Sequence, residues 1–168
     1  KMKKSISLIG MAGAGKSSIG KQLADHLGFS FTDSDLLIEN EYQESLQQVL
    51  NRSGKENFLK IEEKALMSIE FNNTILATGG SAIFSELAMD YIRSRSSIIF
   101  IEAPYNKIVE RVSNFSERGF LKSSDQTIQE AFVERQFLYK HFADFEVVND
   151  ASQEKCLKKI LDLIHQKL

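Results

Sequence analysis

The chain has 168 residues, 42% of them hydrophobic and 26% charged, a composition that excludes low-complexity classes and is ordinary for one globular domain. Lys and Arg total 21 against 23 Asp and Glu, so the net charge of -2 gives no overall attraction to nucleic acid or to an anionic membrane. A single cysteine, Cys156, excludes an internal disulfide and a cysteine-based metal cluster, which is typical of a reducing cytosol.

Short apolar runs alternate with amphipathic stretches along the chain. Apolar, β-branched runs predict five strands, at residues 6–9, 29–32, 74–78, 97–101 and 145–148. Helical spacing predicts helices at 17–27, 36–42, 45–51, 56–70, 86–93, 106–112, 127–141 and 154–167, while 113–126 is polar and irregular. This alternation predicts an α/β fold in three α-β-α layers with a central five-stranded parallel sheet. No linker or repeat interrupts it, so residues 1–168 are expected to form a single domain.

The first residues have a basic start and an apolar stretch that mimic a secretory signal. The residues that follow at once, Gly15-Lys16-Ser17, fit a phosphate-binding loop better than a secretory signal. No apolar run in the chain approaches the ~20 residues of a membrane span. We therefore expect a cytoplasmic protein that binds neither membrane nor nucleic acid.

Residues 10–17 read Gly-Met-Ala-Gly-Ala-Gly-Lys-Ser, the pattern G-x-x-x-x-G-K-[ST], between an expected strand and an expected helix. Glycines let several backbone N–H groups turn inward as an anion nest, and the helix N-terminus adds partial positive charge. Lys16 is placed to reach the β- and γ-phosphates of a nucleoside triphosphate, and Ser17 to ligate Mg²⁺. The pattern predicts a P-loop NTPase-like fold. Its expected nucleotide-binding residues are Gly10, Ala12, Gly13, Ala14, Gly15, Lys16, Ser17 and Ser18.

A dinucleotide site is the nearest alternative for this run. Gly13-Ala14-Gly15 is able to begin G-x-G-x-x-G, with acidic residues about twenty positions later for a ribose. The sixth position is Ser18 rather than glycine, however, and Lys16 would have no role. We therefore favour a triphosphate site.

An acidic pair, Asp33 and Asp35, follows the second expected strand. On an extended segment, residues two apart face the same side, so both carboxylates are expected to face the phosphate loop. One carboxylate near Mg²⁺ and one near an acceptor hydroxyl is what small-molecule phosphoryl transfer needs. The alternative is a helix cap ahead of Leu36. The strand at 74–78 ends without a carboxylate, and Glu102 is a further candidate after the next strand.

The ordered set of motifs resembles shikimate kinases over nearly the whole chain. The resemblance is carried by the phosphate loop, Asp-x-Asp at 33–35, a glycine turn at 79–81, Arg118, and Arg-x-x-x-Tyr at 135–139. It implies a monomeric enzyme that uses ATP to phosphorylate the 3-hydroxyl of shikimate, on the route to chorismate and aromatic amino acids.

On the nucleotide side, the resemblance implies that the loop lysine neutralises the transferring phosphoryl group. Ser17 would ligate Mg²⁺ directly, and Asp33 would contact it through water. Arg111 would contact adenine. Arg118, in a lid at about 113–126, would close over the phosphates and take part in catalysis.

On the acceptor side, the resemblance places the substrate among helices at about 34–70. Asp35 would hold substrate hydroxyls and act as the base. The turn at Gly79 and Gly80 would offer a backbone N–H. Arg135 would pair with the substrate carboxylate, a bidentate task suited to guanidinium.

Several positions depart from the family pattern. Leu59 stands where the family has a second arginine of the carboxylate clamp, and Lys60 points about 100° away around the helix, although its long stem makes it a candidate replacement. Ser81 replaces a third glycine, Gly119 replaces a lid proline, and 149–152 lacks the usual Arg and Pro. Two alternatives therefore stay open: a related kinase of gluconate or nucleotide type, and an ATP-binding module without catalysis.

Overall fold

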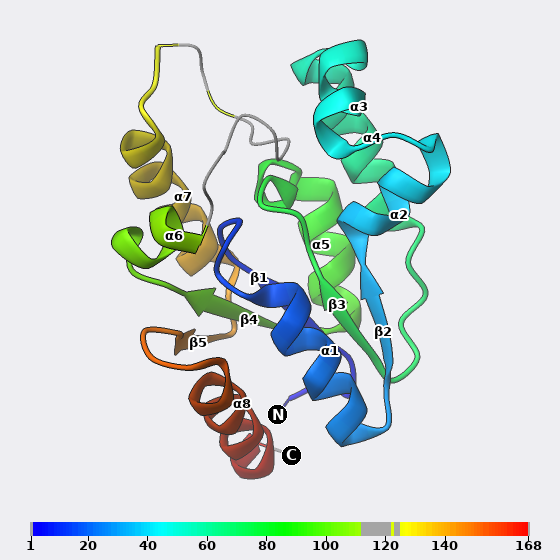
Figure 1. Ribbon diagram of the computed structural model, residues 1–168. Helices are drawn as coiled ribbons and strands as arrows, with labels where there is room; N and C mark the ends of the chain where they lie inside the picture. Colours follow the sequence, from blue (N-terminus) through cyan, green and yellow to red (C-terminus); the bar gives the residue numbers. More distant parts are fainter. Residues whose placement is uncertain (1, 112–121, 123–124, 168) are drawn as a thin grey trace.

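A parallel sheet of five strands, in the order β2-β3-β1-β4-β5, forms the centre of the structure (Figure 1). The computed structural model describes residues 2–111, 122 and 125–167. The strands are β1 (Ile6–Ile9), β2 (Ser30–Asp33), β3 (Thr74–Ala77), β4 (Ser97–Glu102) and β5 (Phe145–Val148). Each neighbouring pair is parallel, so the carboxyl ends of all five strands lie at the same edge.

Helices connect the strands and cover the sheet. They are α1 (Lys16–Leu27), α2 (Ser34–Tyr42), α3 (Leu46–Ser53), α4 (Lys55–Met67), the 3₁₀ turn η1 (Ala82–Phe84), α5 (Glu86–Arg95), α6 (Tyr105–Arg111), α7 (Ile128–Phe142) and α8 (Gln153–Lys167). Helices α1 and α8 pack together against one face, and α5 and α7 contact β4 from the other (Figure 1). The three-layer α/β fold expected from the sequence is confirmed.

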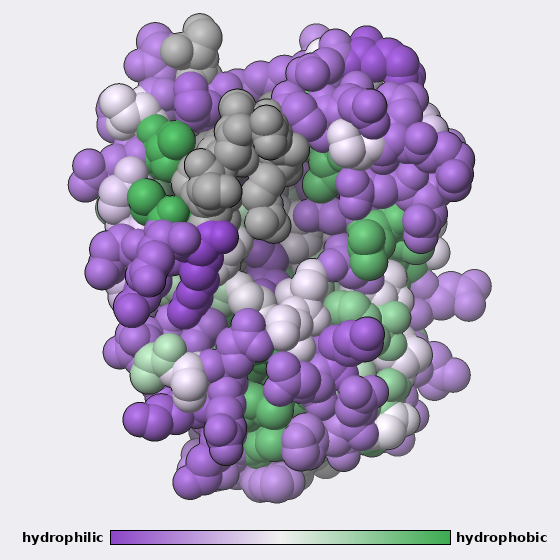
Figure 2. All heavy atoms as spheres, viewed as in Figure 1, coloured by the Kyte–Doolittle hydropathy of each residue, from purple (hydrophilic) through white to green (hydrophobic). Residues whose placement is uncertain are grey.

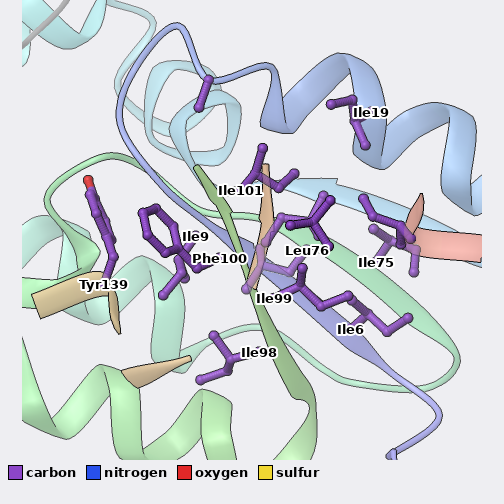
Figure 3. Close-up of a cluster of buried hydrophobic side chains, with 14 of the residues drawn as sticks. Ile6, Ile9, Ile19, Ile75, Leu76, Ile98, Ile99, Phe100, Ile101 and Tyr139 are labelled. Atoms are coloured by element: carbon purple, nitrogen blue, oxygen red, sulfur yellow. The ribbon is translucent and has the colours of Figure 1, made fainter. Parts of the chain in front are cut away.

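The main core lies between the sheet and its helices. Strands β1, β3 and most of β4 are buried, because helices cover both faces of a parallel sheet. Figure 3 shows side chains of the central strands packed together, with Ile19 of α1 above them. Tyr139 of α7 stacks on Phe100 at 5.1 Å between ring centroids. This packing fixes the strand ends from which the functional loops leave.

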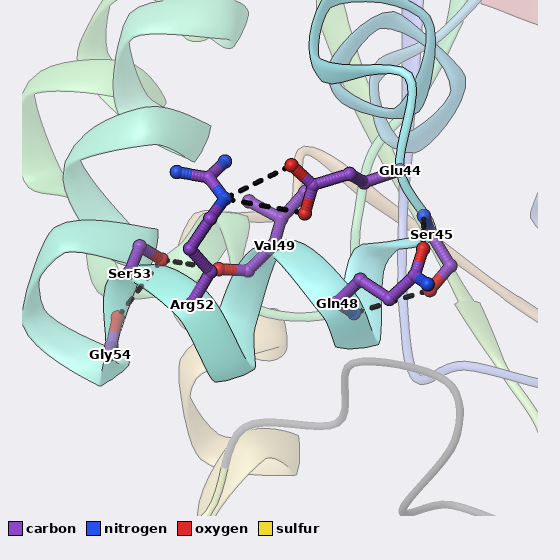
Figure 4. A network of polar contacts seen from close by, with 7 residues as sticks. All are labelled: Glu44, Ser45, Gln48, Val49, Arg52, Ser53 and Gly54. Carbon is purple, nitrogen blue, oxygen red and sulfur yellow. Dashed lines mark hydrogen bonds and ion pairs between the residues drawn. The ribbon is translucent and has the colours of Figure 1, made fainter.

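Helices α2, α3 and α4 share a second, smaller core made of Ile38, Val49, Phe58 and Ala65. The start of α3 is fixed by a capping box, in which Ser45 and Gln48 exchange side-chain and backbone hydrogen bonds (Figure 4). In the same view Arg52 pairs with Glu44 at 3.0 Å. These helices form a structural unit of their own beside the sheet.

The observed elements match the expected ones to within three residues, with two differences. The turn η1 was not predicted, because three residues are too few for a periodic pattern. The expectation of an extended segment at 33–35 was wrong: Asp33 ends β2, and Ser34 already begins α2. Most of 113–126 lies outside the described residues.

Two further observations concern sequence features noted above. Within the described ranges, no helix combines the length and apolar character needed to cross a membrane. Cys156 lies buried on α8 as a free thiol.

Candidate active site

One cavity of about 600 Å³ opens at the carboxyl ends of β1, β2 and β3. This is where open α/β sheets bind their ligands. Figure 2 shows that hydrophilic residues cover most of this side of the molecule and that hydrophobic ones gather in small separate patches. Expected site residues that line the cavity are Ala12, Gly13, Gly15, Lys16, Ser17, Ser18, Asp33, Asp35, Gly80, Arg111 and Arg135.

The phosphate loop leaves β1 and leads directly into α1. Gly10, Gly13 and Gly15 all have positive φ, between 86° and 149°, which explains why glycine is needed there. A Cβ on Gly10 would also lie only 2.6 Å from the carbonyl oxygen of Ile101. The Lys16 ammonium donates to the Met11 carbonyl at 2.9 Å and to the Gly10 carbonyl, so it lies across the loop.

Ser17 and Asp33 meet beside this loop. The Ser17 hydroxyl donates to Asp33 Oδ2, while Asp33 Oδ1 accepts from the backbone N–H of Asp35 at 2.9 Å. Asp33 is therefore the N-cap of α2 and also faces the phosphate loop, which unites the two interpretations of the acidic pair. The two side chains bring hard oxygen donors together, as Mg²⁺ requires.

Asp35 lies on the first turn of α2 and faces Glu62 of α4. A Cβ on Gly79 would overlap both Asp35 Oδ1 and Glu62 Oε2, so the turn after β3 passes close to both carboxyl groups only because residue 79 is glycine. The buried Ser34 hydroxyl accepts from the Gly79 N–H at 3.0 Å and fixes this approach. Burial, followed by the charge of Asp35, raises the pKa of Glu62 to about 8.

Arg135 forms the opposite side of this corner. It is 2% exposed, donates to the Gly80 carbonyl at 3.2 Å and lies over the Phe84 ring at 5.2 Å. The Tyr139 hydroxyl donates to the same carbonyl at 2.8 Å, and burial raises the pKa of Tyr139 to about 12. The guanidinium is thus held in place before any ligand arrives.

The far side of the phosphate loop is held by residues from α6, β5 and α8. Arg111 donates to the Gly13 carbonyl at 3.2 Å, and Asn149 donates to the Ala14 carbonyl at 2.9 Å. Ser18 donates to Gln153 Oε1 at 2.7 Å. This arrangement places the expected adenine residue against the loop.

Comparison with known proteins decides the family. The family model described as shikimate kinase matches residues 12–165. This chain belongs to the shikimate kinase family. A shikimate kinase of Francisella tularensis subsp. novicida is 36% identical over 162 residues, covering 94% of this chain and 92% of the relative.

Solved structures agree with this membership. A shikimate kinase from Acinetobacter baumannii in complex with shikimate superposes with a TM-score of 0.86 at 28% identity, covering 98% of this chain and 94% of that one. A gluconokinase from Sinorhizobium meliloti, at 16% identity, a TM-score of 0.50 and coverage of 98% and 97%, shares the fold alone.

Among the described residues, one side chain expected to bind substrate, that of Lys60, is not brought into the cavity. Lys60 is exposed and lies 3.9 Å from Glu56, and neither Lys60 nor Leu59 lines the cavity. Lys60 points away from the cavity around α4, and its long side chain does not bend back toward the acceptor side. Arg118 lies outside the described residues.

Sequence reasoning missed several residues of the site. Glu62, Asn149 and Gln153 carry no recognisable motif. A signal for Glu62 exists: it follows Phe58 by four residues, on the face of α4 that the apolar residues mark as buried. A carboxyl group on such a face is rarely fully buried unless it has a partner, so its presence there marks a polar site.

Proposed function

We propose that this protein transfers the γ-phosphate of ATP to the 3-hydroxyl of shikimate, on the route to chorismate and aromatic amino acids. One observation carries the proposal. The cavity of about 600 Å³ has the phosphate loop with Lys16 on one side and the buried guanidinium of Arg135 on the other. A cavity of this size holds a small acceptor, and a fixed guanidinium suits its carboxylate.

On the nucleotide side, Lys16 withdraws from the loop carbonyls to bind the transferring phosphate, whose charge it offsets. Ser17 and Asp33 are the residues that would hold Mg²⁺, which supplies further neutralisation of phosphate charge when bound. Arg111, already against Gly13, is positioned to contact the nucleotide. ATP would thus lie along the loop, with its γ-phosphate toward the acceptor corner.

On the acceptor side, Asp35 holds the substrate hydroxyls and takes the proton of the attacking hydroxyl. The Gly80 carbonyl is occupied by Arg135 and Tyr139, and the Gly79 N–H donates to Ser34, which leaves the backbone N–H of Gly80 as the group offered to substrate. Arg135 orients the acceptor through its carboxylate, and orientation is a large part of phosphoryl-transfer catalysis.

The remaining assignments complete the proposal. Arg118 closes a lid at about 113–126 over the phosphates, and the acceptor lies among helices in residues 34–70 of a single domain. We also propose that the protein works as a cytoplasmic monomer. These points rest on the resemblance to the family.

A coupled assay with ATP, Mg²⁺ and shikimate tests the proposal. We expect turnover that falls at least 10³-fold in Lys16→Met, because that side chain acts where charge develops in the transition state. Lys21→Met, an exposed lysine on the same helix, is the matched control and should retain turnover. Phosphorylation of gluconate or a nucleotide in preference to shikimate would contradict the proposal, and so would ATP binding without acceptor-dependent ADP release.

A further inference from the structure

In the part of the chain that the structure describes, the acceptor corner of the cavity has a single guanidinium, that of Arg135. Among the described residues that line the cavity, the basic ones are Lys16, Arg111 and Arg135, and the first two lie against phosphate-loop carbonyls. Helix α4 adds a carboxyl group, Glu62, instead of a basic residue. Leu59, at the family's arginine position, precedes Glu62 by three residues and so shares its side of the helix. The acceptor carboxylate therefore enters a corner with one cation and two carboxyl groups nearby.

Glu62 is removed from water and close to Asp35. Glu62 is only 3% exposed. The turn at Gly79 passes close to the carboxyl groups of both Asp35 and Glu62. Burial and the charge of Asp35 favour the neutral form of Glu62, while Arg135 and Lys16 favour the ionised form. The balance is a pKa of about 8, so near neutral pH this group is mostly a carboxylic acid.

Groups facing Glu62 come from three neighbouring elements. The titratable side chains are Lys16 of α1, Asp35 of α2, and Arg135 and Tyr139 of α7. Basic residues of α3 and α5 are engaged elsewhere: Arg52 with Glu44, Arg93 with α7 carbonyls, and Arg95 with the ring of Tyr91. Tyr139 stays neutral up to pH 9, because burial raises its pKa to about 12.

An anionic acceptor changes this balance. Its carboxylate pairs with Arg135, which withdraws from Glu62 part of the positive charge that favours ionisation. The acceptor also adds a negative charge inside a buried cavity, where charges interact strongly. Both effects oppose an ionised Glu62.

We propose that Glu62 is a specificity-determining residue that must be a neutral acid for the anionic acceptor to bind. The inference rests on the proposed function, because it takes shikimate as that acceptor. Binding of shikimate above neutral pH would then draw one proton from solvent onto the Glu62 carboxylate. This proton removes a negative charge beside the acceptor carboxylate. It thereby does part of what the positive charge of a second clamp arginine would do.

Calorimetry of shikimate binding tests the proposal without catalysis. Titrations at pH 9 in two buffers of different ionisation enthalpy should show uptake of about 0.9 proton per shikimate bound, and titrations at pH 6.5 should show less than about 0.1. The Kd for shikimate should rise about tenfold from pH 7 to pH 9. The primary amide of shikimate, which lacks the negative charge, should bind with a Kd that is constant to within twofold.

Variants assign the proton to its residue. Glu62→Gln, which is nearly isosteric with the neutral acid, should remove the proton uptake and flatten the Kd profile to within twofold. Glu63→Gln is the matched control, because its carboxylate accepts from Ser85 outside the cavity and the tenfold rise should persist. If Glu62→Gln does not fold, a pH-independent Kd or an absence of proton uptake in the wild-type titrations would still overturn the proposal.

Failure of the role proposed for Glu62 can be distinguished from failure of the proposed function. Binding of shikimate without turnover would contradict the proposed function, while proton uptake still decides the role of Glu62. A pH-independent Kd, an equal rise for the amide, or proton uptake that persists in Glu62→Gln would each overturn the role of Glu62. Absence of binding at every pH would overturn both proposals.

Discussion

The two sides of the cavity are built in different ways. The phosphate wall (residues 10–18 with Asp33) comes almost entirely from one run of the chain, and a loop of this kind binds phosphate mainly through backbone N–H groups. The acceptor wall (Asp35, Glu62, Gly79, Gly80 and Arg135) takes side chains from α2, α4 and α7, brought together by packing. A change such as Leu59 can therefore alter the acceptor wall while the phosphate wall stays intact.

Arg135→Gln is expected to give the largest difference between an effect on the acceptor wall and an effect on the phosphate wall. Loss of the buried charge would remove the proposed contact with the acceptor carboxylate, so the KM for shikimate should rise about 100-fold, which corresponds to roughly 3 kcal/mol. The KM for ATP should change less than twofold. Steady-state kinetics measure both, with Lys140→Gln on the exposed side of α7 as control. Equal changes in the two KM values would show that the walls are not independent.

Gly79→Ala should have the next largest effect. Its Cβ would displace both Asp35 and Glu62, so kcat/KM for shikimate should fall about 30-fold, or roughly 2 kcal/mol. Gly54→Ala is a suitable comparison, because Gly54 has φ 79° and open space around its Cβ position. Gly54→Ala should lower the melting temperature through backbone strain, without a specific loss in the kcat/KM for shikimate. Similar kinetic losses in both variants would rule out the carboxyl groups as the cause.

Leu59→Arg is expected to strengthen the acceptor wall. An arginine at i would lie beside Glu62 at i+3 and add a second cation to the corner. At pH 9 the KM for shikimate should fall about fivefold relative to the unmodified protein, roughly 1 kcal/mol. Lys60→Arg, which points to solvent, should leave it unchanged. A fall of the same size at pH 6.5 would argue against a link to Glu62.

Asn149→Ala should give the smallest effect, and on the phosphate wall alone. Its amide donates to the Ala14 carbonyl, but its buried Oδ1 lacks a partner among the described residues, so removing both atoms partly offsets the loss. The KM for ATP should rise about threefold with no change for shikimate. A shift in the KM for shikimate would mean that the loop between β5 and α8 also supports the acceptor wall.

The same division explains what the sequence could predict. Strands such as Ile6–Ile9 are buried on both faces, so an apolar run is enough to locate them. The phosphate wall is contiguous, and its pattern specifies each residue. The acidic pair singled out Asp35, and the resemblance gave it a specific role. Arg135 was assigned through the resemblance alone, since nothing local distinguishes a cavity arginine from a surface one.

Residues outside any local pattern escaped prediction for a physical reason. Helical spacing shows which face of α4 is buried, but not that the buried face holds a carboxyl group beside Asp35. The segment after β2 was expected to be extended, whereas the capping bonds of Asp33 start a helix one residue later. Such features depend on contacts between distant elements or on a single cap.

The buried Cys156 has a practical consequence. Burial raises the pKa of its thiol to about 11, so only about one thiol in ten thousand is ionised at pH 7 and able to react with alkylating dyes. Cysteines introduced at exposed positions such as Lys60 on α4 and Glu110 on α6 would therefore be labelled selectively. Labelling of Cys156 would therefore contribute little signal when fluorescence is used to measure distance changes across the cavity as ligands bind.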